Sequence, residues 1–163
     1  MPKKNDIAPL FIVIGIAVVL QLALIGIDCQ QTPVKVAKAF ASDYYYLDGG
    51  MQNHLCADLA EDGELIDNYL FSKEKEARQR GLGTNYLRHK FTKLHVSVVE
   101  PGEDKITVHL TGTTRVCINP AFMMVGRLFG IGKNHAVDET LELVKENNQW
   151  RVCGTPFGMA PEV

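Results

Sequence analysis

Charged side chains are missing from one long stretch near the start of this 163-residue chain. From Ile7 to Ile27, 21 residues include no lysine, arginine, aspartate or glutamate, and Gln21 is the only strongly polar side chain. An α-helix of that length spans about 30 Å, which is the thickness of the hydrocarbon core of a bilayer. The stretch therefore predicts a transmembrane helix over residues 7–27, with the lipid bilayer as its partner.

The same stretch lacks the features of a cleaved export signal. A signal peptide has an apolar region of about 7–15 residues, followed by a small-x-small cleavage site. Residues 24–28 contain no convincing site of that kind, and the residues before Cys29 differ from the usual lipoprotein pattern. A retained anchor is the preferred interpretation, and a signal peptide and a lipoprotein are the alternatives.

The two flanks of this stretch differ slightly in charge. Lys3 and Lys4 make the N-terminal flank positive, whereas Asp28 begins the other flank. Positive residues favour the cytoplasmic side. We therefore predict a cytoplasmic tail over residues 1–6 and an exported domain over residues 28–163, in the inner (plasma) membrane of a bacterium with the domain on the periplasmic side.

An excess of basic residues and the common metal motifs are also absent. The formal net charge is −2, which argues against the basic surface that binds nucleic acid. The four cysteines include no C-x-x-C pair, so neither a redox dithiol, a zinc ribbon nor covalently attached haem is indicated. The sequence also has no H-E-x-x-H motif and no EF-hand loop. No catalytic residue, metal, cofactor or nucleic-acid partner is predicted.

All four cysteines follow the apolar stretch, and in an exported domain they are able to form disulfide bonds. Four cysteines allow three complete pairings, between which the sequence does not choose. The alternative is that some of them are small buried apolar residues. The candidates for a disulfide are Cys56, Cys117 and Cys153.

The first half of the remaining chain has helical periodicity. Thr32-Pro33 is typical of a helix start, because the hydroxyl caps the helix and proline suits its first position. Val36, Phe40 and Tyr44 then recur on one face until two glycines follow. Two further helices are predicted, a short one over residues 51–59 and a longer one over residues 66–79.

The second half alternates between apolar and polar residues, which is typical of strands. Residues 94–98 and 106–118 alternate in this way, which predicts two strands joined by a turn at Pro101-Gly102. A second hairpin is predicted with its turn at Asn147-Asn148. Asparagine tolerates the positive φ that a tight hairpin turn needs. The expected domain is α+β, with helices packed on a curved, mainly antiparallel sheet.

Two segments carry a resemblance to a known family. Residues 40–50, FASDYYYLDGG, followed by a short helix, and the hairpin over residues 139–152 are similar to the opening and the last two strands of nuclear transport factor 2-like (cystatin-like, cone-shaped) domains. The resemblance covers most of residues 33–155 and implies a cavity inside the cone. Enzymes of that fold place Asp, Tyr and His side chains in the cavity, so the corresponding candidates here are Tyr44, Asp58 and Tyr69.

One apolar insertion, over residues 119–132, interrupts the alternating half. A helix that is apolar on all sides must be covered by something, and methionine and phenylalanine are frequent at binding surfaces. The insertion is expected to plug the end of its own sheet, to contact a partner or to dip into a bilayer surface. As a partner interface it would use Phe122, Met123, Met124, Val125, Leu128 and Phe129.

These features predict a non-catalytic, membrane-anchored accessory or assembly subunit of a larger membrane protein complex, whose partners are integral membrane subunits. Similar architecture is found in scaffold subunits of type IV secretion machines, although this chain is shorter. The alternative is a membrane-tethered enzyme or small-ligand-binding domain that uses the cavity of the cone. A deep pocket at the candidate tyrosines would favour that alternative.

Overall fold

The computed structural model describes residues 8–28, 31–61, 63–118 and 134–156. The chain divides into two compact units, Met1–Gln31 and Thr32–Val163. The first unit contains the helix α1 (Ala8–Asp28). The second unit contains the sheet and the remaining helices.

The prediction of a transmembrane helix over residues 7–27 is wrong. Within the described part of the chain, no helix combines the length and the apolar character needed to cross a membrane. A crossing helix needs about 20 consecutive apolar residues, and the side chains that are described in α1 are those of residues 11–21. The single-pass membrane organisation expected from the sequence is corrected by this finding.

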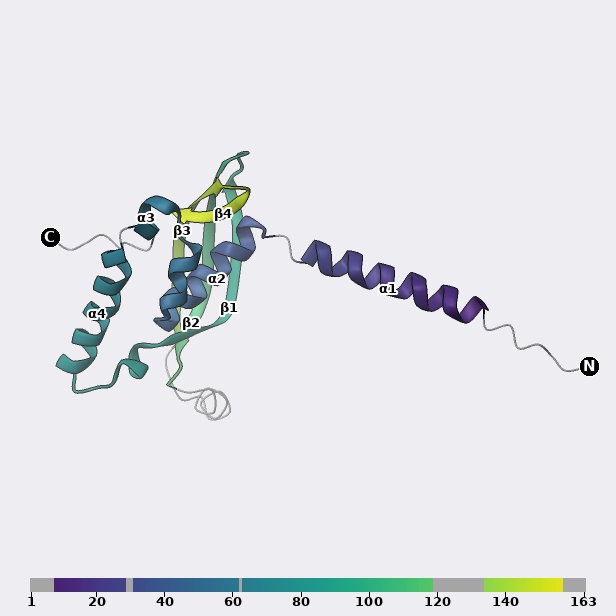
Figure 1. Cartoon of the computed structure of the whole chain (residues 1–163). Helices are drawn as coiled ribbons and strands as arrows, with labels where there is room; N and C mark the ends of the chain where they lie inside the picture. Colours follow the sequence, from purple (N-terminus) through teal and green to yellow (C-terminus); the bar gives the residue numbers. More distant parts are fainter. Residues whose placement is uncertain (1–7, 29–30, 62, 119–133, 157–163) are drawn as a thin grey trace, which may run out of the picture. The chain divides into compact units, whose positions relative to one another are not determined.

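In the second unit, the helices come first and the strands follow, which makes it an α+β domain (Figure 1). The four strands form one antiparallel sheet in the order β1-β2-β3-β4. The elements, with 3-10 helices labelled η, are α2 (Pro33–Tyr46), η1 (Gly49–His54), α3 (Ala57–Glu61), α4 (Gly63–Gln79), η2 (Thr84–Leu87), β1 (His89–Glu100), β2 (Lys105–Val116), β3 (Asn134–Glu146) and β4 (Gln149–Cys153).

Helix α2 begins and ends as the local sequence predicts. The hydroxyl oxygen of Thr32 accepts a hydrogen bond from the backbone N–H of Lys35 at 3.3 Å, and Pro33 follows in the first turn. The helix ends at Leu47, which adopts a left-handed conformation with φ of 56°. Its apolar face is buried against the sheet, so the predicted amphipathic helix is confirmed.

The single short helix predicted over residues 51–59 is replaced by two pieces, η1 and α3. Leu55, between them, forms a parallel β-bridge with Val152 of β4. The backbone N–H of Cys56 also donates to the carbonyl of Val152 at 2.9 Å. The chain leaves helical geometry here because its backbone groups bond to β4, a long-range contact that helical periodicity does not reveal.

The second hairpin turns where the sequence predicts it. Asn147 and Asn148 have φ values of 48° and 64°, so both occupy the left-handed region that a two-residue hairpin turn requires. The turn joins β3 to β4, in which Leu143 lies opposite Val152. The prediction of a hairpin at these two asparagines is therefore confirmed.

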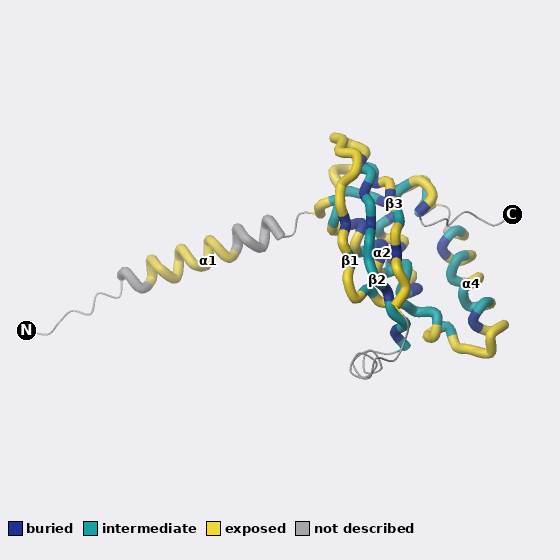
Figure 2. The backbone as a smooth tube through the Cα atoms, turned by 180° about the vertical axis from the view of Figure 1, so that it is seen from behind, coloured by how far each residue is buried: buried dark blue, intermediate teal, exposed yellow. Residues whose placement is uncertain are grey.

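The face of the sheet that packs against α2 has two parts with different chemistry. At one end it is apolar and packs with the buried Phe40, and at the other end it carries polar side chains. Figure 2 colours the backbone by burial, with buried residues in dark blue and exposed residues in yellow. The apolar half consists of Val108, Leu110, Leu141, Leu143 and Val152. The polar half consists of His89, Thr114, His135 and Glu139, placed on the same face by the strand registers.

Gly112 lies on β2 at the boundary between these two halves. A Cβ atom at this position would meet the backbone oxygen of Lys93 at 2.6 Å, which is too close for any side chain. The strand β1 is irregular between Phe91 and Lys93 at the same level. Only glycine therefore allows the two strands to approach here.

Candidate functional site

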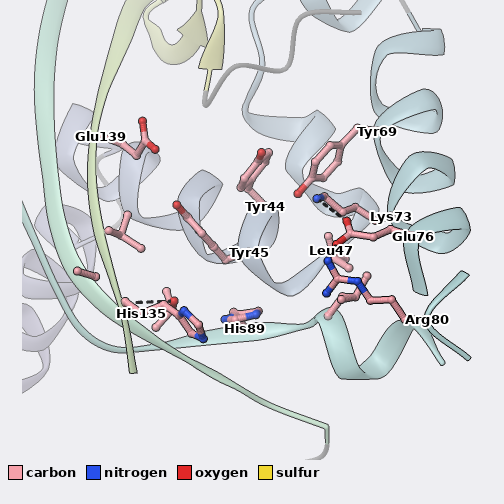
Figure 3. Close-up of a pocket in the computed structure, with 14 residues that line it drawn as sticks. Tyr44, Tyr45, Leu47, Tyr69, Lys73, Glu76, Arg80, His89, His135 and Glu139 are labelled. Atoms are coloured by element: carbon pink, nitrogen blue, oxygen red, sulfur yellow. Dashed lines mark hydrogen bonds and ion pairs between the residues drawn. The ribbon is translucent and has the colours of Figure 1, made fainter. Parts of the chain in front are cut away.

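A cavity of about 380 Å³ lies over the polar half of the sheet (Figure 3). Its walls come from the end of α2, one side of α4, the 3-10 helix η2 and strands β1, β2 and β3. This volume is within the range of small-molecule sites. The lining residues are Tyr44, Tyr45, Leu47, Tyr69, Lys73, Glu76, Arg80, Leu87, His89, Thr114, His135, Ala136, Val137 and Glu139.

Two consecutive tyrosines near the end of α2 point to different walls. The ring of Tyr44 stacks on that of Tyr69 of α4, with centroids 4.7 Å apart and 16° between the planes. The ring of Tyr45 meets Phe91 of β1 edge-on, with centroids 5.1 Å apart. Because neighbours on a helix are about 100° apart, one turn of α2 contacts both α4 and the sheet.

The tyrosine hydroxyls at the cavity are held in the protonated form. Burial raises the pKa of Tyr69, and the nearby Tyr44 raises it further. Burial also raises the pKa of Tyr45 to about 12, with a smaller contribution from the charge of Glu139. A protonated phenol donates one hydrogen bond and also accepts, so these side chains suit a ligand that carries acceptor groups.

The wall formed by α4 is a chain of ion pairs. Nζ of Lys73 lies 3.0 Å from one carboxylate oxygen of Glu76, and a guanidinium nitrogen of Arg80 lies 2.6 Å from the other. The hydrogen bond from Lys73 lowers the pKa of Glu76. With the three groups ionised, this wall carries one uncompensated positive charge.

The opposite wall is the polar half of the sheet. The imidazole rings of His89 and His135 meet at 5.2 Å between centroids, although the strands that carry them are separated by β2. Burial lowers the pKa of His89, and the charge of His135 lowers it further. Thr114, between the two strands, is buried. The lowered pKa favours the neutral form of the His89 imidazole in this wall.

Two of the three cavity residues proposed from the sequence line this cavity. Tyr44 and Tyr69 lie in its aromatic wall, whereas Asp58 is not among the lining residues. Asp58 lies on the short helix α3, where it is exposed. A five-residue helix that starts at the bridge to β4 does not direct this carboxylate into the cavity.

Three of the four cysteines lie in the described residues, and Cys29 lies outside them. Cys56 and Cys153 form a disulfide, while Cys117 is free and buried. In the described part of the chain, one group of side chains has atoms close enough to hold a metal ion, namely Cys56, Glu146 and Cys153. Because the two sulfurs are bonded to each other, this group is not a metal site in the oxidised protein.

The predicted partner interface lies outside the described residues. Its members, Phe122, Met123, Met124, Val125, Leu128 and Phe129, all fall within residues 119–133. The accessory-subunit prediction depended on this segment and on the transmembrane helix. It therefore has no support from the described part of the molecule.

Sequence reasoning missed most of the polar lining, although the local signal exists. Tyr69, Lys73, Glu76 and Arg80 follow one another at spacings of four, three and four, which places them on one side of α4. His135 and Glu139 likewise continue the inward positions of Leu141 on β3. Polar residues on an expected inner face were the available signal for a cavity.

No protein-family model matches the chain, and no curated protein matches it. The resemblance to nuclear transport factor 2-like domains therefore stays a prediction from the sequence.

Proposed function

We propose that the second unit is a small-ligand-binding domain that holds its ligand in the cavity between α2, α4 and the polar half of the sheet. The observation that carries this proposal is the cavity of about 380 Å³ with Tyr44 and Tyr69 stacked in its wall. Sites of this kind combine aromatic surface with a few convergent polar groups. Here the polar groups are hydroxyls, imidazoles and ion-paired side chains.

We propose that the domain binds without catalysis. A general acid or base works best with a pKa near the operating pH. The tyrosines at the cavity have raised pKa values, and the pKa of Glu76 is lowered. The tyrosines and Glu76 are thus fixed as hydrogen-bond donors and as an ion-pair partner, which suits these groups to recognition rather than to proton transfer.

We propose further that the domain works in an oxidising compartment outside the cytoplasm. The support for this location is the disulfide between Cys56 and Cys153. Disulfides persist in secreted and periplasmic proteins and are rare where glutathione keeps thiols reduced.

A fragment screen on the full chain tests the binding function. A set of small aromatic alcohols, acids and amines is titrated into ¹⁵N-labelled protein, and backbone amide shifts are recorded. We expect at least one fragment to give saturable shifts at the lining residues. The Tyr69→Ala variant should weaken the binding of that fragment by about fivefold, because it removes an aromatic contact worth about 1 kcal/mol.

Tyr86→Ala is the matched control, because Tyr86 is exposed on η2 and does not line the cavity. It should leave the affinity unchanged. Absence of saturable shifts at the lining residues for every fragment would refute the binding function. So would an equal loss of affinity in the two tyrosine variants.

A further inference from the structure

The two sides of the cavity carry charges of opposite sign, which defines the ligand more closely. On one side, Lys73 and Arg80 share the single carboxylate of Glu76, at 3.0 Å and 2.6 Å respectively. Three ionised groups with two positive charges leave this side positive. Both cations line the cavity, and the side chain of Arg80 remains 60% exposed, so its guanidinium is accessible to a ligand.

On the other side, the strand β3 contributes a carboxylate. Glu139 lies opposite Leu110 of β2, at the point where the apolar half of the sheet gives way to the polar half. Its side chain is half-buried and lines the cavity. Figure 3 shows Glu139 across the cavity from Lys73 and Arg80, with the rings of Tyr44 and Tyr45 between them.

The aromatic residues between the two charged sides respond to both of them. Burial raises the pKa of Tyr44 and a hydrogen bond with Tyr69 lowers it, while the charge of Lys73 lowers it and that of Glu139 raises it. The Tyr44 hydroxyl therefore lies within the field of a positive group and of a negative group. Charges that face a partly desolvated cavity favour groups of opposite sign in the occupant.

We propose that the ligand of this cavity is a small zwitterion with a planar or ring-shaped body. Its anionic group faces Lys73 and Arg80, its ammonium group faces Glu139, and its body contacts the tyrosine rings. This inference rests on the proposed ligand-binding function and adds to it the class of ligand.

Four probes with the same aromatic body and different charges test this inference on the full chain. They are 4-(aminomethyl)benzoate, 4-methylbenzoate, 4-methylbenzylamine and 4-methylbenzyl alcohol, each titrated by amide chemical shifts. The zwitterion should bind about tenfold more tightly than either singly charged probe, since each matched charge contributes roughly 1.4 kcal/mol. The alcohol should bind most weakly.

Two pairs of variants locate the two charges. Arg80→Ala should weaken the binding of the zwitterion and of the benzoate by about tenfold and leave the affinity for the amine unchanged. Its control is Arg78→Ala, which removes the neighbouring i,i+4 ion pair with Glu74 outside the cavity. Glu139→Gln should weaken the binding of the zwitterion and of the amine but not that of the benzoate. Its control is Asp138→Asn, where the carboxylate pairs with His109 instead.

The outcomes separate this inference from the binding function. Equal affinities for all four probes would overturn the proposal that the ligand is a zwitterion. Equal effects of Arg80→Ala and Arg78→Ala would do the same. In both cases the proposed ligand-binding function of the cavity would remain. If the zwitterion fails to bind while other fragments still shift the lining residues, the inference again falls alone. If no aromatic fragment binds, the inference and the proposed function fall together.

Discussion

The apolar half and the polar half belong to the same face of the same strands, yet different elements pack against them. Over the apolar half, α2 places Phe40, which is completely buried, on leucine and valine side chains. Over the polar half, α2 ends and the wall is completed by α4, leaving a cavity of about 380 Å³. The apolar half of the sheet thus stabilises the fold, and the polar half lines the proposed binding site.

The comparison teaches that alternation alone does not define a core. Val137, Glu139 and Leu141 occupy successive inward positions on β3, but the middle one carries a charge. A carboxylate is tolerated there because the cavity keeps it half-exposed, whereas a fully buried charge without a partner would be costly. In this sheet the charged residue at an inward position lies at the boundary between the apolar half and the polar half.

The largest expected effect comes from the centre of the apolar half. Phe40→Ala should lower the free energy of unfolding by about 3–5 kcal/mol, because it removes a fully buried ring and leaves a cavity. Urea unfolding followed by circular dichroism measures this change. Glu139→Gln, in the polar half, should change the same quantity by about 0.5 kcal/mol or less. Similar losses in the two variants would erase the distinction between the halves.

The next effect concerns the disulfide, which ties the chain before α3 to the end of β4 beside the apolar half. Replacing both Cys56 and Cys153 by alanine should lower the free energy of unfolding by about 2–4 kcal/mol, because the unfolded chain regains conformational freedom. Unfolding with and without a reductant provides the control. Reductant should destabilise the original protein and leave the double variant unchanged. A wild-type protein that is insensitive to reductant would contradict this prediction.

The smallest effect is the pH dependence of the polar half. Burial lowers the pKa of His89 from its ordinary value of 6.5, so the unfolded chain binds a proton more readily than the folded one. The folded state has its full stability from this group above pH 6.5. It loses stability as the pH falls from 6.5 to the lowered value of the folded state.

His89→Gln should therefore flatten the fall in unfolding free energy between pH 7.5 and the acid range, measured by urea unfolding at several pH values. His95→Gln is the control, because His95 lies exposed on the same strand and does not line the cavity. Identical pH profiles for His89→Gln and the unchanged protein would show that His89 does not contribute to the pH dependence of stability.

Short sequence signals predicted the structure correctly where it depends on a few consecutive residues. Thr32-Pro33 predicted the start of α2, and Asn147-Asn148 predicted the second hairpin, because caps and turns are determined by a few consecutive residues. The short helix after Gly50 was not predicted correctly, since Leu55 is taken into a bridge with Val152, almost a hundred residues away. The transmembrane prediction depended on the composition of one segment, and no helix in the described residues combines the length and the apolar character that crossing requires.

Only part of the candidate site could be predicted from the sequence. The tyrosines Tyr44 and Tyr69 could be proposed, but Lys73, Arg80 and Glu139 were not, because nothing in the sequence indicates that this side of α4 and this face of β3 line the same cavity. The periods of 3.6 and 2 residues determined the helices, the strands and the faces they bury. Only the tertiary structure decided that α4 and the polar half of the sheet line one cavity, since packing between distant elements depends on the summed contacts of the whole fold.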